Sequence, residues 1–417
     1  MNHSHDTAIP KRYDDALSRQ YDGAALGRLS AELQKELTGD ILPFWQNRMT
    51  DPEGGFYGRI DGEGNLHPDA GRGIIMYARI LWAFSAAYNL LREKSYLDTA
   101  RRAFDYMTGH FLDMEYGGMY WMVAPDGKVT DTKKQIYAQG FVIYGLSEYY
   151  RACGDKEALQ QALELVGLIE KYAWDEKTGG YIEACTREWK PNEDMRLSDK
   201  ESNVPKSMNT HLHIIEPYTN LYRVYPTPEV HSRIKTILEI FRTRIFNPRT
   251  GHLDLLFHED WTPAGSEVSY GHEIEASWLL DEAAETIGEA GTYQPIVKRV
   301  ADSATEGLLP DGSMAYEYDP KSGKLDAERH WWVEAEAMVG YFNLYQKTGQ
   351  GHYLETVLGL WEFIKGNLID RSGGEWFWGV RPDGKVNRQS DKAGFWKCPY
   401  HNTRLCTELI TRIKGMI

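Results

Sequence analysis

One short motif, a glycine-rich turn followed by aromatic or large apolar residues, recurs six times in this 417-residue chain. The copies lie about 62 residues apart, with one wider gap between the third and the fourth. A fixed period of this kind is typical of repeated structural units. The copies are Gly54-Gly55-Phe56-Tyr57, Gly117-Gly118-Met119-Tyr120, Gly179-Gly180-Tyr181, Gly251-His252-Leu253, Gly312-Ser313-Met314 and Gly373-Gly374-Glu375-Trp376. Each unit has room for two helices and the turn, so we predict six helical hairpins.

The two helices of each unit differ in their apolar pattern. The helix before the turn has charges on one side and an apolar stripe on the other, as at Ile234, Ile237 and Phe241, which predicts a half-solvated outer layer. These outer helices are expected at residues 29–45, 96–111, 157–174, 229–246, 293–308 and 353–368. The helix after the turn is apolar on nearly all sides, which predicts burial on both faces. These inner helices are expected to begin near Tyr77, Tyr137, Asn209, His272, Trp332 and His401.

Six buried helices inside six amphipathic ones form an all-α fold, the (α/α)6 barrel. Residues 56–60 and 376–380 suggest short β-hairpins in the connecting loops, and Asp126-Gly127 and Asp383-Gly384 supply turns. No low-complexity linker interrupts the pattern. We therefore expect a polar tail over residues 1–20 and a single barrel domain over residues 21–417.

Charge and composition narrow the classes of partner and compartment. The net charge of −14 argues against nucleic acid or an anionic membrane as the main partner, whereas a neutral small molecule fits. We find no signal-peptide run and no stretch of membrane-spanning length, so we expect a cytoplasmic protein, a monomer or weak homodimer. Four scattered cysteines suggest free thiols. They are Cys153, Cys185, Cys398 and Cys406.

Some polar residues of the chain are hard to explain by a structural role. When the inner helices are aligned by their first residues, these polar residues fall at one end of the barrel. A single histidine at such a position is more often a hydrogen-bonded core residue, but several at matching repeat positions indicate an active site. The aligned residues are Arg79, Gln139, His211, His213, His272, Glu275, Glu334, Glu336 and His401, with Trp331, Trp332 and Trp396 beside them.

Three kinds of chemistry are compatible with this set of residues. A metal site has weak support, since His272 and Glu275 are neighbours at i, i+3 but no HExxH motif or cysteine cluster occurs. Glycoside hydrolysis needs paired carboxylates, which glutamates could supply. Proton abstraction beside a carbonyl fits best, because histidine titrates near neutral pH and Arg79 suits a developing oxyanion. Epimerisation and aldose–ketose isomerisation both remain open, and neither needs a cofactor.

Five segments resemble the N-acylglucosamine 2-epimerase superfamily, and within it most closely the cellobiose 2-epimerases, with D-mannose 2-epimerases and mannose isomerases as close relatives. The segments are Ala78-Arg79-Ile80-Leu81-Trp82, Asn209-Thr210-His211-Leu212-His213, Tyr270-Gly271-His272-Glu273-Ile274-Glu275, Trp331-Trp332-Val333-Glu334-Ala335-Glu336 and Trp396-Lys397-Cys398-Pro399-Tyr400-His401. The resemblance implies an (α/α)6 barrel that interconverts glucose and mannose at the reducing end of a sugar through an enediol, without metal or cofactor.

The resemblance also implies roles for single residues. His272 and His401 would be the acid/base pair at C2, and His213 would assist proton transfer. Trp332 and Trp396 would stack on the sugar, although the sequence does not decide between Trp331 and Trp332. The residues expected to bind the open-chain sugar or orient the histidines are Arg79, Tyr137, Asn209 and Glu275.

Three positions carry a second interpretation. Asn209 has the residue type of a helix N-cap. His211 is two residues from His213 and points away from it, so we expect a structural role. Tyr77 stands where cellobiose 2-epimerases are expected to have an Ile-Leu-Asn-type run. A bulky side chain near the site would alter the room for a second sugar, which leaves open the alternative of a mannose 2-epimerase or mannose isomerase acting on free monosaccharides.

Overall fold

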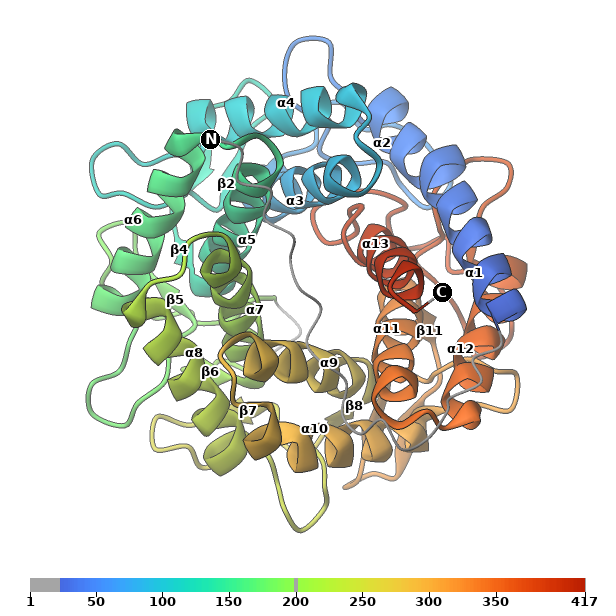
Figure 1. Cartoon of the computed structure of the whole chain (residues 1–417). Helices are drawn as coiled ribbons and strands as arrows, with labels where there is room; N and C mark the ends of the chain where they lie inside the picture. The colour runs from blue at the N-terminus through green and yellow to red at the C-terminus, as the bar shows by residue number, and fades with distance from the viewer. Residues whose placement is uncertain (1–22, 199–201, 417) are drawn as a thin grey trace, which may run out of the picture.

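The computed structural model of the protein describes residues 23–198 and 202–416, so the tail expected over residues 1–20 lies outside the described part. Two concentric layers of helices dominate it (Figure 1). The outer helices are α1 (Gly23–Glu36), α2 (Leu42–Arg48), α4 (Lys94–His110), α6 (Lys156–Tyr172), α8 (Pro228–Ile240), α10 (Ala290–Ala304) and α12 (Gly351–Phe363). The inner helices are α3 (Ile74–Leu91), α5 (Ile136–Cys153), α7 (Met208–Val224), α9 (Tyr270–Thr286), α11 (Trp331–Thr348) and α13 (His401–Lys414).

The inner helices form a closed ring. Each packs against the next along the chain, and α13 packs against α3 and also against the outer helix α1 (Figure 1). The predicted helices therefore occur where the apolar pattern placed them. Short non-α turns extend four outer helices: the π-helical η1 (Leu37–Ile41), η2 (Phe241–Ile245) and η4 (Ile364–Leu368), and the 3₁₀ turn η3 (Thr305–Gly307).

Local signals explain where outer helices begin. The side chain of Asp155 accepts hydrogen bonds from the amides of Glu157 and Ala158 at the start of α6. Thr227 caps α8 in the same way, and Pro228 follows at the first helical position, where its missing N–H costs nothing.

Short antiparallel strands link neighbouring repeats. The strand that leads into each of five inner helices pairs with a strand after the next glycine turn, and Ile60 bridges Ala393 at the sixth junction. The predicted Asp126-Gly127 turn joins β2 to β3. The strands are β1 (Arg72–Gly73), β2 (Met122–Val123), β3 (Val129–Asp131), β4 (Lys134–Gln135), β5 (Ala184–Cys185), β6 (Lys206–Ser207), β7 (Leu256–Phe257), β8 (Val268–Ser269), β9 (Glu317–Asp319), β10 (Lys324–Asp326), β11 (Arg329–His330) and β12 (Gly379–Val380).

A polar side chain at the same position of five inner helices binds the backbone that follows a glycine turn. In α3 the Tyr77 hydroxyl accepts from the Phe56 amide at 2.8 Å, and in α5 the Gln139 Oε1 atom accepts from the Met119 amide at 2.9 Å. Buried amides need such partners. Gly55 has a φ of +64°, and a Cβ atom there would lie 2.4 Å from the Tyr77 hydroxyl. The corresponding residues of the other helices are His211, Glu273 and Glu334.

Buried ion pairs hold four of the turns. Lys134 lies 3.1 Å from Asp113, and Lys206 lies 2.8 Å from Asp175. Although burial raises the pKa of Asp175, the hydrogen bonds from Lys206 and Thr178 outweigh it and hold that pKa at about 2. The other two pairs are Arg72 with Asp51 and Lys392 with Asp370.

Helix α3 corrects one expectation about the membrane. Among the described residues, α3 is long and apolar enough to cross a membrane by length and composition. This contradicts our expectation that no stretch has membrane-spanning length. Within the protein, 78% of this stretch is buried, as in the core helix of a closed layer. The four cysteines are free thiols, as predicted.

Candidate active site

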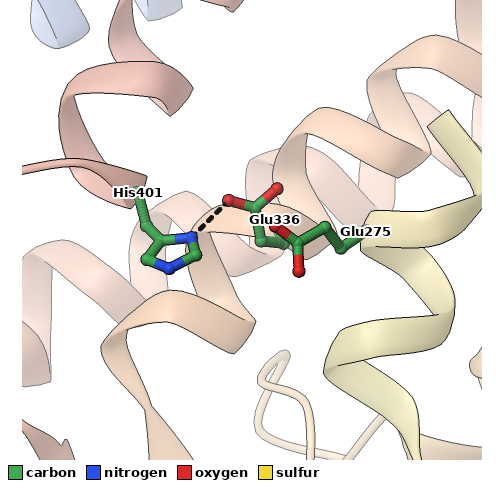
Figure 2. Close-up of side chains that lie close together, drawn as sticks. All are labelled: Glu275, Glu336 and His401. Carbon is green, nitrogen blue, oxygen red and sulfur yellow. Dashed lines mark hydrogen bonds and ion pairs between the residues drawn. The ribbon is translucent and has the colours of Figure 1, made fainter. Parts of the chain in front are cut away.

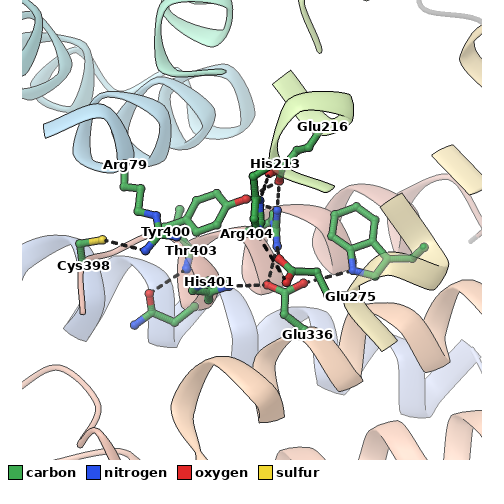
Figure 3. Close-up of polar contacts among 12 residues, drawn as sticks. Arg79, His213, Glu216, Glu275, Glu336, Cys398, Tyr400, His401, Thr403 and Arg404 are labelled. Carbon is green, nitrogen blue, oxygen red and sulfur yellow. Dashed lines mark hydrogen bonds and ion pairs between the residues drawn. The ribbon is translucent and has the colours of Figure 1, made fainter. Parts of the chain in front are cut away.

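Charged residues meet where the inner helices begin. Two positions beyond the turn-binding residue, five inner helices direct a side chain toward the centre of the ring, and α13 adds a sixth. Five of the six are charged or imidazole side chains, and Figure 3 shows them gathered together. The six positions are Arg79, Phe141, His213, Glu275, Glu336 and Arg404.

Arg404 on α13 is the hub of this cluster. Its side chain is fully buried, and its two terminal nitrogens donate to carboxylates from three other helices (Figure 3). Nη1 donates to Glu216, while Nη2 donates to Glu275 and lies 2.7 Å from Glu336. Buried carboxylates require such a partner, because an unpaired charge inside a protein is strongly destabilising. One guanidinium thereby fixes three acids of the ring.

His401, the first residue of α13, contacts one of these acids. Its Nδ1 atom lies 2.7 Å from Oε1 of Glu336 (Figure 2). The other oxygen of that carboxylate, Oε2, accepts from Nε1 of Trp278 at 3.1 Å. A carboxylate in this position accepts the Nδ1 hydrogen and leaves Nε2 available for chemistry. Burial raises the pKa of Glu336 and lowers the pKa of His401 well below its usual value.

His213 has the same arrangement within α7. Its Nδ1 atom lies 2.8 Å from Oε2 of Glu216, and its Nε2 atom lies 3.9 Å from Oε2 of Glu275. Burial lowers the pKa of His213. Burial alone raises the pKa of Glu216, but Arg404 and the His213 hydrogen bond bring it to about 2. Glu216 is therefore a carboxylate, whereas burial and the neighbouring charge of Glu336 raise the pKa of Glu275 well above its usual value.

His272 on α9 is half-buried, in contrast to the charged cluster. Its Nδ1 atom lies 2.8 Å from the Ser269 hydroxyl, and burial lowers its pKa to about 3. The Trp332 indole contacts two imidazoles, with ring centroids 4.7 Å from His272 and 5.7 Å from His401. Trp332 is half-buried, whereas Trp331 is buried against Trp378. Trp332 therefore contacts both histidines, whereas Trp331 meets His401 edge-on at a centroid distance of 6.3 Å.

Arg79 on α3 is buried and held by neighbouring groups. Its Nη2 atom donates to the Tyr137 hydroxyl at 2.7 Å and its Nη1 atom to the Trp396 carbonyl at 3.2 Å. The guanidinium also lies over the Phe141 ring, 4.2 Å from its centroid. The Nε–H of Arg79 is buried and has no partner among the described residues, so a donor remains available. Tyr137 and Trp396 are thus placed beside Arg79.

Asn209, the second residue of α7, is half-buried. The N-cap of α7 is Ser207, whose hydroxyl accepts from the Thr210 amide, so Asn209 does not serve as the cap. Its Oδ1 atom is buried without a partner among the described residues. An unpaired acceptor of this kind is costly unless a ligand satisfies it.

A metal ion does not fit these donors. Glu275, Glu336 and His401 bring ligand atoms within 4.8 Å of one another (Figure 2). However, Arg404 donates to both carboxylates, and His401 uses its Nδ1 atom on Glu336. A cation would have to displace a fully buried guanidinium. The cluster is an ion-pair network.

The structure also separates residues that the helix alignment grouped together. Gln139, His211 and Glu334 bind turn backbone away from the centre, so they are not part of the cluster. His211 accepts from the Tyr181 amide and contacts the Ser207 carbonyl, in agreement with the structural role expected for it.

Tyr77 corrects the expectation that it alters the room in the site. Its side chain is fully buried, stacks on Tyr106 with a centroid distance of 4.7 Å and binds Phe56 on both backbone atoms. It points to the outer layer. The expected effect on room for a second sugar is therefore wrong.

Sequence reasoning missed Arg404, Glu216 and Ser269. It also missed Tyr400, whose hydroxyl donates to Glu216. A usable signal was present, because His213 and Glu216, His272 and Glu275, and His401 and Arg404 all follow the same i, i+3 spacing. Residues three apart lie on one side of a helix. Three helices thus carry a histidine with a charged residue one turn deeper.

Comparison with known proteins agrees with this geometry. The N-acylglucosamine 2-epimerase (GlcNAc 2-epimerase) family profile matches residues 55–404. The chain is 52% identical over 386 residues to a cellobiose 2-epimerase of Bacteroides fragilis, covering 92% of this chain and 98% of the relative. A cellobiose 2-epimerase of Ruminococcus albus is 40% identical, with the same coverage.

A solved structure shows the same fold. The cellobiose 2-epimerase of Bacillus thermoamylovorans superimposes with a TM-score of 0.90 at 41% identity, covering 93% of this chain and all of that one. Family profile, sequence and fold agree over nearly the whole length. The chain belongs to the N-acylglucosamine 2-epimerase family.

Proposed function

We propose that this protein is a sugar 2-epimerase built on a single (α/α)6 barrel domain, and that it interconverts glucose and mannose at the reducing end of cellobiose-type disaccharides, giving glucosyl-mannose from cellobiose. The observation that carries the proposal is the placement of two imidazoles, His272 and His401, against the same indole, that of Trp332. Each uses Nδ1 on a protein partner, which leaves Nε2 for the sugar. The similarity to cellobiose 2-epimerases supports the disaccharide substrate.

The two histidines account for inversion at C2. One neutral imidazole takes the C2 proton of the open-chain aldose at Nε2, and the electron pair of the broken C–H bond forms the C1=C2 bond of the enediolate. The other imidazole, protonated, then delivers its Nε2 proton to the opposite face of C2. Neutral imidazole is the form needed for abstraction, and burial favours it at both residues.

Negative charge that develops on O1 or O2 needs a stabilising group. Arg79 supplies a guanidinium whose Nε–H is unpartnered, and Tyr137 and the Trp396 carbonyl hold it in place. Fixed donors in a buried site stabilise such charge more than donors in water. His213, paired with Glu216, is suited to moving the hydroxyl proton.

The remaining residues would bind the sugar or support the histidines. Asn209 offers an unpaired acceptor to a sugar hydroxyl. The indoles of Trp332 and Trp396 supply stacking surfaces. Glu275 is fixed by Arg404 and lies close to Nε2 of His213, so it orients that ring.

The alternative is the same chemistry on free mannose and glucose, or proton return to C1 as in a mannose isomerase. Incubation in D2O with cellobiose, and separately with D-mannose, followed by NMR of the products decides among them. Deuterium at C2 of glucosyl-mannose supports the proposal. Turnover of mannose alone supports the monosaccharide enzyme, and a ketose with deuterium at C1 supports the isomerase. No exchange with either sugar would refute the proton-transfer mechanism.

A further inference from the structure

Two serines occupy the same position in neighbouring repeats, but their hydroxyls contact different partners. Ser207 and Ser269 are the last residues before α7 and α9, at the N-cap position, and both are buried. Ser207 makes the usual cap, accepting a hydrogen bond from the Thr210 amide at 3.0 Å. Ser269 makes no side-chain cap bond, and its hydroxyl lies 2.8 Å from Nδ1 of His272. Helix α9 therefore forgoes a stabilising cap in favour of a contact with a histidine.

This partner differs in kind from those of the other two histidines. Glu336 and Glu216 are acids that accept from Nδ1 of His401 and His213. Each can stabilise an imidazolium, because its negative charge lies in direct contact with the ring. The Ser269 hydroxyl fixes the orientation of the His272 ring but brings no charge. The two imidazoles beside Trp332 are therefore chemically unequal.

We propose, resting on the 2-epimerase function proposed above, that Ser269 is a positioning residue that accepts the Nδ1 hydrogen of His272 and so holds the neutral tautomer with its lone pair at Nε2. His272 is then the base of the free enzyme. His401, whose imidazolium is stabilised by Glu336, carries the proton that is delivered to the other face.

The inequality decides which histidine of the pair carries a proton when one of them is protonated. Burial disfavours the protonated ring at both residues, so the pair differs only in where a single proton resides: on His401, which contacts the Glu336 carboxylate, with His272 neutral. In a turnover from that form, the C2 proton moves to Nε2 of His272 while the Nε2 proton of His401 moves to the sugar. The free enzyme returns to that form by exchanging protons with water or by processing the other epimer.

The experiment compares Ser269→Ala with Ser207→Ala, which removes the equivalent hydroxyl of α7. Ser207→Ala should lower Tm through loss of the cap and leave kcat for cellobiose unchanged. Ser269→Ala should keep KM and lower kcat by roughly 10- to 100-fold, as losses of partners that orient a reactive group do.

A spectroscopic readout tests the bond itself. In 15N-labelled wild-type protein, NMR of the ring nitrogens at neutral pH should show His272 with hydrogen on Nδ1. In Ser269→Ala the population should move toward hydrogen on Nε2. A purely structural serine would leave this ratio unchanged.

Two results would overturn the proposal: hydrogen on Nε2 of His272 in the wild-type enzyme, or equal loss of kcat in the two serine variants. If Ser269→Ala does not fold, the wild-type spectrum alone decides. If the wild-type enzyme converts neither cellobiose nor mannose, the 2-epimerase function fails, while the spectrum still reports whether Ser269 sets the tautomer.

Discussion

Nδ1 of His401 lies 2.7 Å from Oε1 of Glu336, and the two residues come from different inner helices, α13 and α11. The contact joins the last described helix to its neighbour at the point where proposed chemistry takes place. Through this contact Glu336 holds the ring hydrogen at Nδ1 and stabilises a positive charge on the imidazole.

Glu336→Gln should lower kcat by roughly 10- to 100-fold, because an amide cannot act as the counter-ion of a protonated His401. Initial rates with cellobiose measure the effect. The matched control is Glu334→Gln, two residues earlier in α11, which keeps an oxygen able to accept from the Met314 amide and should retain activity. Equal losses in both variants would show that the effect is one of folding.

His272→Ala and His401→Ala should each lower epimerisation by at least about 100-fold, the usual contribution of a general acid or base. Each variant keeps one base, so in D2O it should exchange the C2 hydrogen of one epimer only, and the two variants should exchange different epimers. NMR of recovered glucosyl-mannose and cellobiose separates the cases. Exchange of the same epimer by both would contradict the assignment to opposite faces.

Chelation should leave the enzyme active. Arg404 occupies the carboxylates of Glu275 and Glu336, so these groups do not need a cation to balance their charge. Dialysis against EDTA followed by an assay without added metal tests this directly. A loss of activity that Mn²⁺ or Zn²⁺ restores would show that a metal displaces the guanidinium.

Tyr77→Phe should reduce stability and leave substrate preference unchanged. Loss of the hydroxyl leaves the buried backbone of Phe56 without its partner, at a cost of about 1–3 kcal/mol. Urea unfolding measures the cost, and the ratio of kcat/KM for cellobiose and mannose measures the preference. A changed ratio would restore a role for Tyr77 in the site.

His211→Gln should make the protein less sensitive to acid. Burial lowers the folded-state pKa of His211 to about 4, below its ordinary value of about 6.5, so the unfolded chain binds more protons between these pH values. Stability therefore falls as pH drops through this window, by up to about 1.4 kcal/mol per pH unit, and glutamine removes this contribution.

Gln139 already performs the same task in the preceding repeat, which makes glutamine a natural replacement for His211. The measurement is the change in Tm between pH 7 and pH 5. His352→Gln, at an exposed position, is the control and should behave like the wild type. A variant as acid-sensitive as the wild type would contradict the prediction.

The helices were predictable because apolar periodicity is a local property. The side of the helix on which a residue lies could also be predicted. Successive residues of an α-helix are rotated by about 100° around the helix axis, so residues two apart are rotated by about 200°. This rule placed His211 correctly away from His213. Applied to Tyr77 and Arg79, it would have placed Tyr77 in the outer layer.

The charged network was not predictable in the same way. Arg404 matters because three carboxylates from three other helices converge on it, and such convergence depends on how the helices are arranged around the ring. Likewise, Ser269 has the residue type of an ordinary cap. Only its distance from His272 reveals a different use.

The contact of α13 with both α1 and α3 has a consequence for biosynthesis. Arg79 leaves the ribosome long before His401 and Arg404, and the three residues meet only when the ring closes. A nascent chain or a fragment truncated before α13 has the helices of five repeats but neither His401 nor the guanidinium that neutralises three buried acids. Catalytic activity in this architecture therefore reports that translation has passed α13 and that the ring has closed.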